Sequence, residues 1–380
     1  MTTEKPSLDL LRSITDEQVL RLLMEEGRLT RAEIAVRTGI SKTTISESMR
    51  RLAQVGLVVD TGERTSGRGR AGSYYTLADG CGVAVVTAIT PTGAVAEALD
   101  ALGGVLARSE MSYDRSAGKA RASKALRTVV ARVRDDVSGA VQACVVSAAD
   151  PVDRNTGRLV QMPDSPFLVG ELDPIAILDD LIEGQVLVDN DVNWAARAER
   201  ASGAAAHVDD FVYMHLGEGL GAAVVSDGQV RRGSLGVSGE IAHVVTSGPN
   251  GTAVPFTEVF AELGLRQGAS TAVDVDAVQA LLDAAQSGHA PTAVRAIDTL
   301  ADAVAGVLLA AIAFTDPQLI IIGGPWGRLP GFLDTLVARA QHWPRPIHIT
   351  TSALAEHPDM LGARAAAVES LRAAIVATTR

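Results

Sequence analysis

Glycines and acidic residues gather in the stretch from Leu216 to His243, which reads LGEGLGAAVVSDGQVRRGSLGVSGEIAH. Its first three glycines alternate with other residues, so the backbone there can turn sharply or approach a ligand without a Cβ in the way. Three further glycines lead to Glu240 and His243, a carboxylate and an imidazole. Glycine spacing alone favours a tight β-turn within a sheet over a phosphate or sugar site. The rest of the chain must therefore decide between these two interpretations.

A second polar cluster, Asp189-Asn190-Asp191, lies between a predicted strand at residues 185–188 and a predicted helix at residues 194–202. Adjacent polar groups between a strand end and a helix start are a common arrangement for ligand binding. Asn190 and Asp191 are also residue types that commonly cap helix N-termini. From the residues alone, both interpretations stay open.

Length and composition indicate a large globular protein. The chain has 380 residues, so two or three domains are expected, and its 47% hydrophobic and 21% charged residues are typical of a protein with a large core. The longest uncharged apolar run, residues 303–315, is shorter than the roughly 20 residues that cross a bilayer, and the N-terminus has no apolar signal core. We therefore expect a cytoplasmic protein with no membrane partner. Cys81 and Cys144 lie in apolar stretches and are expected to be buried, with neither a metal site nor a disulfide framework.

The net charge of −11 is unevenly distributed. Residues 28–72 contain nine Lys and Arg against four Asp and Glu, so this part carries +5 while the remainder carries −16. A basic segment on an acidic chain indicates a nucleic-acid-binding module attached to a body that repels DNA. The alternative is a basic face that only contacts solvent.

Helical patterns near the N-terminus predict a winged helix-turn-helix. Thr30 and Glu33 form a capping-box pattern, and Ser41 is placed to cap the helix that follows. The predicted elements are, in order, a helix over residues 16–26, a short helix ending at Gly39, a helix over residues 42–54, and two wing strands at residues 57–59 and 74–77. The wing and its basic linker thus span residues 57–77 of a DNA-binding domain that we place at residues 1–79.

The outer face of the third helix supplies the candidate DNA contacts, which are Lys42, Thr43, Thr44, Ser46, Glu47, Arg50 and Arg51. Arginine can bind guanine and glutamate can accept from cytosine N4 in the major groove. Lys42 and Arg51 lie nearer the flanks, where we expect them to hold phosphates. Arg68 and Arg70, on glycine hinges in the wing, are expected to enter a minor groove. The alternative is a small protein-interaction module on which these are ordinary surface residues.

Strands and helices alternate twice after residue 80, which predicts an α/β body of two lobes with a cleft between them over residues 80–380. The predicted strands are residues 82–89, 93–98, 105–113, 140–147, 185–188, 211–216, 222–225 and 319–322. The predicted helices are residues 119–137, 175–182, 194–202, 298–314 and 361–377. Asp227-Gly228 predicts a hairpin turn within this body.

The order of these pieces resembles the ROK family, which groups sugar kinases with sugar-responsive repressors. The motifs that carry the resemblance are SKTTISESMRRLAQVGLV in the helix-turn-helix, VLVDNDVNWAARAE, HLGEGLGAAVVSDGQVRRGSLGVSGEIAH, and IIIGG near the end. Each motif is weak alone, but together and in this order they are specific. The resemblance implies a two-lobed actin-like, or hexokinase-like, body with a sugar in the cleft.

The resemblance also implies which residues would bind the sugar, namely Asn190, Asp191, Glu240, His243 and Glu258. Carboxylates accept hydroxyl hydrogens, and asparagine offers both a donor and an acceptor, so these residue types suit a ligand rich in hydroxyl groups. The alternatives that involve no ligand are helix capping for Asn190 and Asp191, a solvent-exposed loop position for Glu240, and a buried structural role for His243.

Two departures from the family pattern change the expected chemistry. Kinases of the family carry an Asp-x-Gly-Gly-Thr phosphate loop, whereas the equivalent hairpin here reads TAITPTGAV over residues 87–95. Without that acid and those glycines there is no evident cradle for ATP phosphates, so we expect no enzyme activity and no cofactor. The family's zinc cysteines are also missing from the segment after His243, and one histidine does not supply the four ligands of structural zinc. We expect no metal, and the Gly before that His is replaced by Ala242.

We therefore expect a transcriptional regulator that binds a double-stranded DNA operator as a homodimer or homotetramer and responds to a sugar or sugar-phosphate effector. The first alternative is an effector-independent regulator whose body serves only oligomerisation or protein interaction. The second alternative, a sugar kinase, is disfavoured by the missing phosphate loop.

Overall fold

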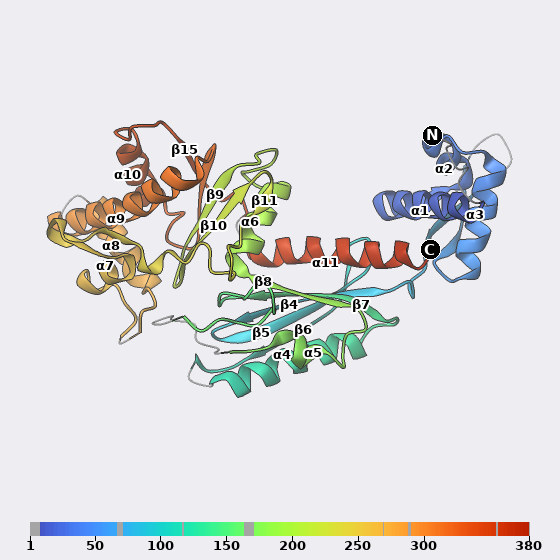
Figure 1. Ribbon diagram of the computed structural model, residues 1–380, viewed down its shortest axis with the longest axis horizontal. Coiled ribbons are helices and arrows are strands. Elements are labelled where there is room, and N and C mark those ends of the chain that lie inside the picture. Colours follow the sequence, from blue (N-terminus) through green and yellow to red (C-terminus); the bar gives the residue numbers. More distant parts are fainter. Residues whose placement is uncertain are drawn as a thin grey trace.

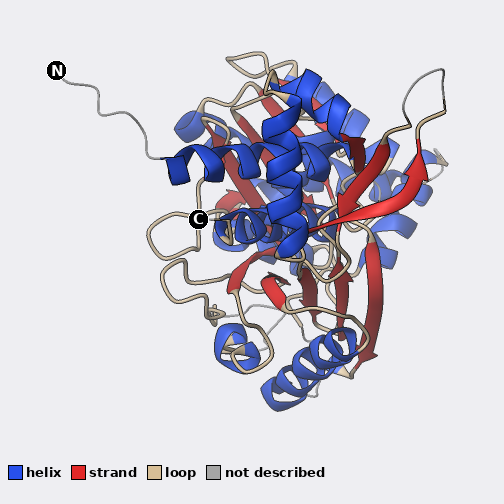
Figure 2. Cartoon of the chain, turned by 90° about the vertical axis from the view of Figure 1, so that its right-hand side faces the viewer, coloured by secondary structure: helices blue, strands red, loops and turns tan. Residues whose placement is uncertain are grey.

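The computed structural model describes residues 8–66, 71–115, 118–162, 171–268, 270–287, 290–354 and 356–379. Its element order divides into an N-terminal head and a body of two lobes, each lobe built on one five-stranded sheet. Figure 1 shows the head at one end, the C-terminal lobe at the other, and a long terminal helix between them. Figure 2, which looks from the head's side, shows helices lying over the strands.

The head is a winged helix-turn-helix, as the sequence predicts. Its elements are α1 (Leu8–Glu26), β1 (Arg28–Thr30), α2 (Arg31–Thr38), α3 (Lys42–Gln54), β2 (Val58–Arg64) and β3 (Ser73–Leu77). The capping box is confirmed, because the Glu33 amide donates to Thr30 Oγ1 at 3.2 Å and the Thr30 amide donates to Glu33 Oε2 at 2.7 Å. Gly39 ends α2 with a φ of 70°, a left-handed conformation that favours glycine.

The head differs from the expected one in its sheet. The first wing strand extends to Arg64, well beyond the three residues expected, and β1 adds a third strand that the sequence did not predict. The strands are antiparallel in the order β1-β3-β2. β1 has only three residues, so it carries too little alternation to be recognised from sequence.

The N-terminal lobe contains a mixed sheet in the order β6-β5-β4-β7-β8, with β4, β7 and β8 parallel. Its elements are β4 (Val83–Thr90), β5 (Gly93–Leu99), β6 (Val105–Ser112), α4 (Gly118–Asp135), β7 (Val141–Ala148), α5 (Pro174–Leu178) and β8 (Gln185–Asn190). Strand β4 is apolar apart from its two threonines because both of its faces are covered, one by α4 and the other by α11 (Pro358–Ala377). Cys81 and Cys144 are both buried, as expected, and both are free thiols.

The C-terminal lobe repeats this plan with a sheet in the order β11-β10-β9-β14-β15. Its strands are β9 (Phe211–Leu216), β10 (Leu220–Ser226), β11 (Gln229–Val230), β14 (Leu319–Gly323) and β15 (His348–Thr351), with a separate pair β12 (Val245–Ser247) and β13 (Ala253–Pro255). Its helices are α6 (Asp191–Ser202), α7 (Phe256–Glu262), α8 (Val275–Gln286), α9 (Pro291–Thr315) and α10 (Pro330–Ala340). The hairpin turn is confirmed, since Asp227 and Gly228 both have positive φ.

Helix α9 is the one helix of the described chain that is long and apolar enough to cross a membrane, and it is longer than the uncharged run that the sequence shows. Its residues Leu300, Val304 and Leu308 are fully buried in the core that α9 shares with β9, β14 and α7. A buried core helix satisfies the same length and composition test. Burial in this core accounts for the apolar residues on the inner face of α9, whereas Leu309 and Phe314 near its C-terminal end are exposed.

Candidate ligand cavity and nucleic-acid interface

A cavity of about 320 Å³ lies where the two lobes meet. The N-terminal lobe contributes the β4–β5 turn with Thr90 and Pro91, and the C-terminal lobe contributes the glycine-rich stretch from Gly217 to Gly221. Of the residues expected to bind sugar, four line this cavity: Asn190, Asp191, Glu240 and His243. Segments far apart in the sequence therefore meet at one site.

Asn190 occupies the end of β8 and caps α6. Its Oδ1 accepts from the Val192 amide at 2.9 Å, and its Nδ2 lies 3.3 Å from the carbonyl oxygens of both Ala148 and Asp150. The capping role left open by the sequence is thus observed. These contacts join the end of β7 to the start of α6 and fix the position of the next residue, Asp191.

Asp191 is the first residue of α6, and its Oδ1 accepts from the Val192 amide at 2.7 Å. Burial raises the pKa of this carboxyl to about 8, and the negative charges of Asp359, Glu240 and Asp150 act in the same direction. At neutral pH a large fraction of Asp191 is therefore protonated. It can donate a hydrogen bond as well as accept one.

Glu240 is positioned by the tight turn at Gly239, where φ is 95° and a β-carbon would lie 1.8 Å from the carbonyl oxygen of Ala222. Only glycine allows the backbone of this loop to approach β10 so closely. Burial raises the pKa of Glu240 to about 7, with the charge of Asp150 adding to the effect. His243 follows in a short 3-10 helix, Ile241–His243, and faces the same cavity.

Glu258, the fifth expected sugar residue, is not among the residues that line the cavity. It lies in the first turn of α7, and its Oε2 accepts from Arg266 Nη2 at 3.1 Å. The neighbouring Thr257 faces the cavity instead. Consecutive helix residues point about 100° apart, so a one-residue difference in register decides which of them reaches a ligand.

Sequence reasoning missed His215 and Glu218 as lining residues. Burial lowers the pKa of His215, which is opposed by the charge of Asp359. Glu218 pairs with Arg115 and accepts from Gln267 Nε2 at 3.2 Å. The available signal for His215 was a lone imidazole in the otherwise apolar strand FVYMHL, directly before the first glycine.

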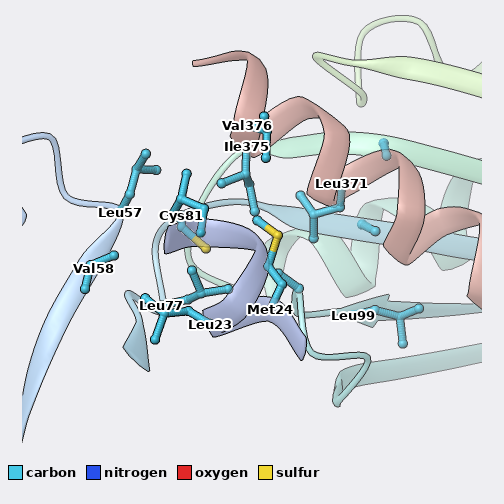
Figure 3. Packing of buried hydrophobic residues seen from close by; sticks show 14 of the residues in the cluster. Leu23, Met24, Leu57, Val58, Leu77, Cys81, Leu99, Leu371, Ile375 and Val376 are labelled. Atoms are coloured by element: carbon cyan, nitrogen blue, oxygen red, sulfur yellow. The ribbon is translucent and has the colours of Figure 1, made fainter. Parts of the chain in front are cut away.

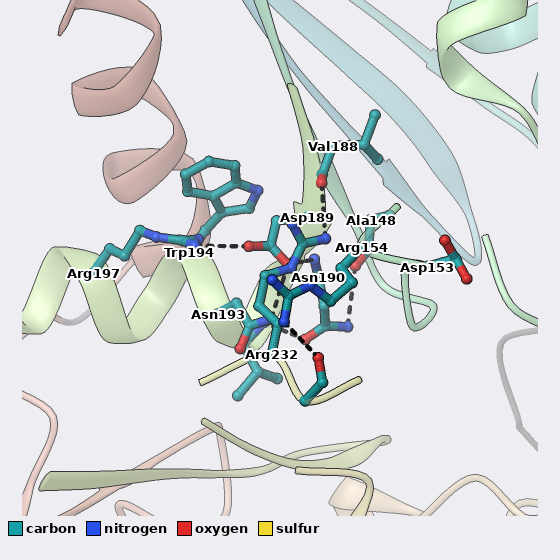
Figure 4. A network of polar contacts seen from close by, with 12 residues as sticks. Ala148, Asp153, Arg154, Val188, Asp189, Asn190, Asn193, Trp194, Arg197 and Arg232 are labelled. Atoms are coloured by element: carbon teal, nitrogen blue, oxygen red, sulfur yellow. Dashed lines mark hydrogen bonds and ion pairs between the residues drawn. The ribbon is translucent and has the colours of Figure 1, made fainter. Parts of the chain in front are cut away.

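A buried polar network holds the Glu240 loop to the start of α6 (Figure 4). Asp189 is 3% exposed and lies 2.8 Å from Arg197 Nη2 and 3.2 Å from Arg232 Nε. Arg232 comes from the loop after β11, and Arg154 of the N-terminal lobe donates to the Gly233 carbonyl of the same loop at 2.9 Å. The loop that ends in Glu240, which follows β11 of the C-terminal lobe, is therefore fixed to the N-terminal lobe.

The head presents the outer face of α3 to solvent. Ser41 caps the helix by accepting from the Thr44 amide at 3.2 Å, while Ile45, Met49 and Leu52 are buried on its inner face. The exposed candidates for DNA contact are Lys42, Thr43, Thr44, Glu47 and Arg50, with Ser46 partly exposed and its hydroxyl donating to the Lys42 carbonyl.

Arg51 differs from the expected free phosphate contact. Its Nη2 lies 2.7 Å from Asp16 Oδ1 and its Nε 3.1 Å from Asp16 Oδ2, so its guanidinium fastens α3 to α1. Arg68 and Arg70 lie outside the described residues. Within the described ranges, no group of three or more His, Cys, Asp or Glu side chains is arranged to hold a metal ion.

Profile and sequence comparisons identify relatives of both parts of the chain. The ROK family profile matches residues 89–369, and a profile described as winged helix-turn-helix DNA-binding matches residues 12–59. The bifunctional enzyme NanE/NanK of Brucella suis biovar 1 is 33% identical over 154 residues, which are 40% of this chain but only 28% of that enzyme. The N-acetylmannosamine kinase of Salmonella typhi is 28% identical over 246 residues, 63% of this chain and 79% of the kinase.

Solved structures share the fold. A ROK family transcriptional regulator described as a homolog of the E. coli MLC protein has a TM-score of 0.64 and 19% identity, covering 97% of this chain and 98% of its own. The ROK hexokinase from Thermus thermophilus has a TM-score of 0.57 and 24% identity, covering 75% of this chain and 97% of its own. Taken with the profile over residues 89–369, these results show that the chain is a member of the ROK family with an N-terminal winged helix-turn-helix DNA-binding domain.

Proposed function

We propose that this chain is a DNA-binding transcriptional regulator whose body binds a neutral sugar or sugar derivative and transfers no phosphoryl group. The observation that carries the proposal is a cavity lined by carboxyl, imidazole and amide groups, in a chain whose head exposes the outer face of α3. The volume of about 320 Å³ falls within the range of small-molecule sites.

The charge of the cavity favours a neutral ligand over a sugar phosphate. Among the described residues that line it, Asp191, Glu218 and Glu240 are acidic, and no lysine or arginine is present. Phosphate recognition in proteins generally relies on arginine, lysine or a nest of backbone amides. A sugar hydroxyl, in contrast, can donate to a carboxylate or accept from a protonated carboxyl.

The same surroundings argue against phosphoryl transfer. The turn between β4 and β5, where the family's kinases carry their phosphate loop, has the sequence Thr90-Pro91-Thr92-Gly93, and Pro91 has no amide hydrogen to offer a phosphate. The curated relatives include an N-acetylmannosamine kinase, so kinase activity needs a direct test.

Isothermal titration calorimetry tests the proposal. Glucose, N-acetylmannosamine, glucosamine and the 6-phosphate of each would be titrated into the purified chain, and the best ligand added to gel shifts with a duplex selected in vitro from random sequence. We expect binding of a neutral sugar, a changed gel shift, and no sugar-dependent ATP turnover. Sugar-dependent ATP hydrolysis, or a uniform preference for phosphates, would contradict the proposal.

A regulator without an effector is the second candidate. It is favoured by Asn190, whose amide is already engaged in capping α6 and joining it to β7. Asp191→Ala and Glu240→Ala discriminate the two candidates in cells that carry a reporter under the selected operator. Unchanged regulation in both variants would support the second candidate, whereas loss of the response to a sugar would support the first.

We further propose that the chain acts in the cytoplasm as a homodimer or homotetramer. Helix-turn-helix proteins commonly read two half-sites with two copies of the recognition helix. Sedimentation of the full chain with and without operator duplex tests the stoichiometry. A single chain per duplex would contradict it.

A further inference from the structure

Helix α11 extends from the cavity to the head. It has 20 residues and is therefore about 30 Å long. Figure 1 shows it running along the N-terminal lobe from the neighbourhood of α6, with the C-terminus next to the head. Its first turn carries Asp359, and its last turns carry Arg372, Ile375 and Val376.

The first turn of α11 is electrostatically linked to the cavity. Asp359 Oδ2 accepts from Ser147 Oγ at 3.1 Å, which ties it to β7. After burial itself, the charge of Asp359 is the largest cause of the raised pKa of Asp191, and it also acts on His215. Any ligand that changes the charge of Asp191 changes the repulsion that Asp359 experiences.

Helix α11 crosses α6 where the two lobes meet. A β-carbon on Gly362 would come within 2.0 Å of the Trp194 carbonyl oxygen, so the helices touch through their backbones. Trp194 packs among Met360, Ala363 and Ala367 of α11, while the other side of α6 packs on the C-terminal sheet. If one lobe moves against the other, α6 and α11 must therefore slide past each other at this contact.

A buried ion pair fixes α11 to the N-terminal lobe. Glu97 of β5 is 1% exposed, and Arg364 donates to it through Nε at 2.6 Å and through Nη2 at 2.8 Å. Burial acts to raise the pKa of Glu97, but the hydrogen bonds and charges of Arg364 and Arg108 outweigh it, and the pKa is lowered. The carboxylate remains ionised and paired, so α11 and this sheet move as one unit.

The last turns of α11 hold the head. Arg372 Nη2 donates to the Met24 carbonyl in the last turn of α1 at 2.8 Å, while its Nε donates to the Ala101 carbonyl of the body at 2.8 Å. A basic side chain at a helix C-terminus satisfies its free carbonyls and opposes its dipole. Ile375 and Val376 pack in one continuous core with Leu23 and Leu57 of the head (Figure 3).

We propose that α11 transmits the state of the cavity to the head, with Asp359 as the positioning residue at the cavity end and Arg372 as the positioning residue at the head end. This role of α11 rests on the proposed function, because it is the route by which a ligand in the cavity would regulate DNA binding. A ligand shifts the head only if it binds one arrangement of the α6–α11 crossing more tightly than the other. Because α11 moves with the N-terminal lobe, a shift at this crossing changes the position of the head, α3 included, relative to the C-terminal lobe.

Hydrogen–deuterium exchange of the full chain tests this coupling without a sugar or an operator. Asp359→Asn removes the charge at the cavity end, and Arg372→Met removes both carbonyl contacts at the head end while retaining an apolar stem. The two variants and their combination form a double-mutant cycle. Asp334→Asn, an exposed acid on α10, controls for the charge change.

We expect Asp359→Asn to change the exchange of residues 20–27, at the end of α1, by about fivefold or more, and to have no such effect in the Arg372→Met background. Asp334→Asn should leave that segment unchanged. An unchanged segment in Asp359→Asn, or an equal change with and without Arg372, would overturn the proposal. If Arg372→Met abolishes all protection of α1, Arg372→Lys, which keeps the charge but not the forked contact, takes its place in the cycle.

The double-mutant cycle tests the role of α11 and the calorimetry tests the proposed ligand, so either proposal can be refuted without the other. A chain that binds no sugar but shows the coupling would refute the proposed ligand and retain the role of α11. A chain that binds sugar but does not show the coupling would support the proposed ligand and refute the role of α11.

Discussion

Arg51 of α3 lies 2.7 Å (Nη2) and 3.1 Å (Nε) from the two carboxylate oxygens of Asp16 in α1. Ser48 also donates to Asp16, and this serine is fully buried. The Asp16 carboxylate thus accepts hydrogen bonds from both Arg51 and Ser48, and these contacts fix the angle between α1 and α3. The side chain of the neighbouring Arg50, one position earlier, is exposed.

Arg51→Met should therefore destabilise the head, whereas Arg50→Met should not. Removing Arg51 leaves the nearly buried Asp16 carboxylate short of its main partner, which typically costs about 1–3 kcal/mol, towards the lower end here because Arg51 is partly exposed. Urea denaturation followed by exchange of residues 42–54 measures the difference. Equal stability of the two variants would show that the ion pair contributes nothing to the packing of α3.

DNA affinity should depend on the exposed side chains of Arg50 and Lys42 on α3. We expect Arg50→Ala to weaken binding to the selected duplex by about 1–3 kcal/mol and to relax its sequence preference at one position, since a base contact is lost. Lys42→Ala should weaken binding to all sequences and reduce the salt dependence of the affinity by about one counterion. Fluorescence anisotropy at several salt concentrations measures both effects. Arg134→Ala on α4, outside the head, is the matched control and should change neither.

Local patterns predicted local structure well. The capping box at Thr30 and Glu33, the hairpin turn at Asp227-Gly228 and the strand leading to Asn190 all involve neighbours in sequence. Their geometry depends on hydrogen bonds and φ values within a few residues. The sequence therefore contains all the information that these features require.

Features that depend on distant partners were not predictable in this way. Glu258 faces Arg266 because of the register of α7, and Asp359 approaches the cavity only because α11 returns across both lobes. The chain also contains α8 and α10, which the apolar patterns did not predict as helices. The pairing of Arg51 with Asp16 spans two helices and gives no periodic signal.

Stability should fall as the pH rises through the range in which the cavity carboxyls ionise. Burial raises the pKa of Asp191 to about 8 and that of Glu240 to about 7, whereas in the unfolded chain both lie near about 4. The folded chain binds these protons more tightly, so their contribution is complete below about pH 4 and is lost as the pH rises through 7 and 8. Urea denaturation at pH 6 and pH 9 should show this loss, and Asp191→Asn should reduce it. Asp334→Asn should keep the slope of the unsubstituted chain, and a slope equally steep in Asp191→Asn would contradict the raised pKa.

Gly362→Ala should destabilise the body because the added methyl group meets the Trp194 carbonyl oxygen. Overpacking of this kind costs about 1–3 kcal/mol when the two helices can move apart. Thermal unfolding measures the cost. Gly80→Ala is the control, since a β-carbon at Gly80 has no heavy atom within 4 Å and that glycine has no positive φ. A melting temperature equal to that of Gly80→Ala would mean that the crossing adjusts freely, which would also weaken the role assigned to α11.

Arg232→Met should loosen the loop that carries Glu240. The substitution removes one of two guanidinium groups from Asp189, which is 3% exposed, and it removes the contact of Arg232 Nη2 with the Val188 carbonyl. We expect a loss of about 1–3 kcal/mol, since Arg197 still pairs with the carboxylate. Loss of the Arg232 contacts should also speed amide exchange over residues 233–243. It should weaken binding of the sugar that calorimetry identifies. Arg231→Met is the matched neighbour, because Arg231 is half exposed and pairs only locally with Asp227 at the hairpin turn. If both variants changed the exchange of residues 233–243 equally, the buried network around Asp189 would not be what holds this loop.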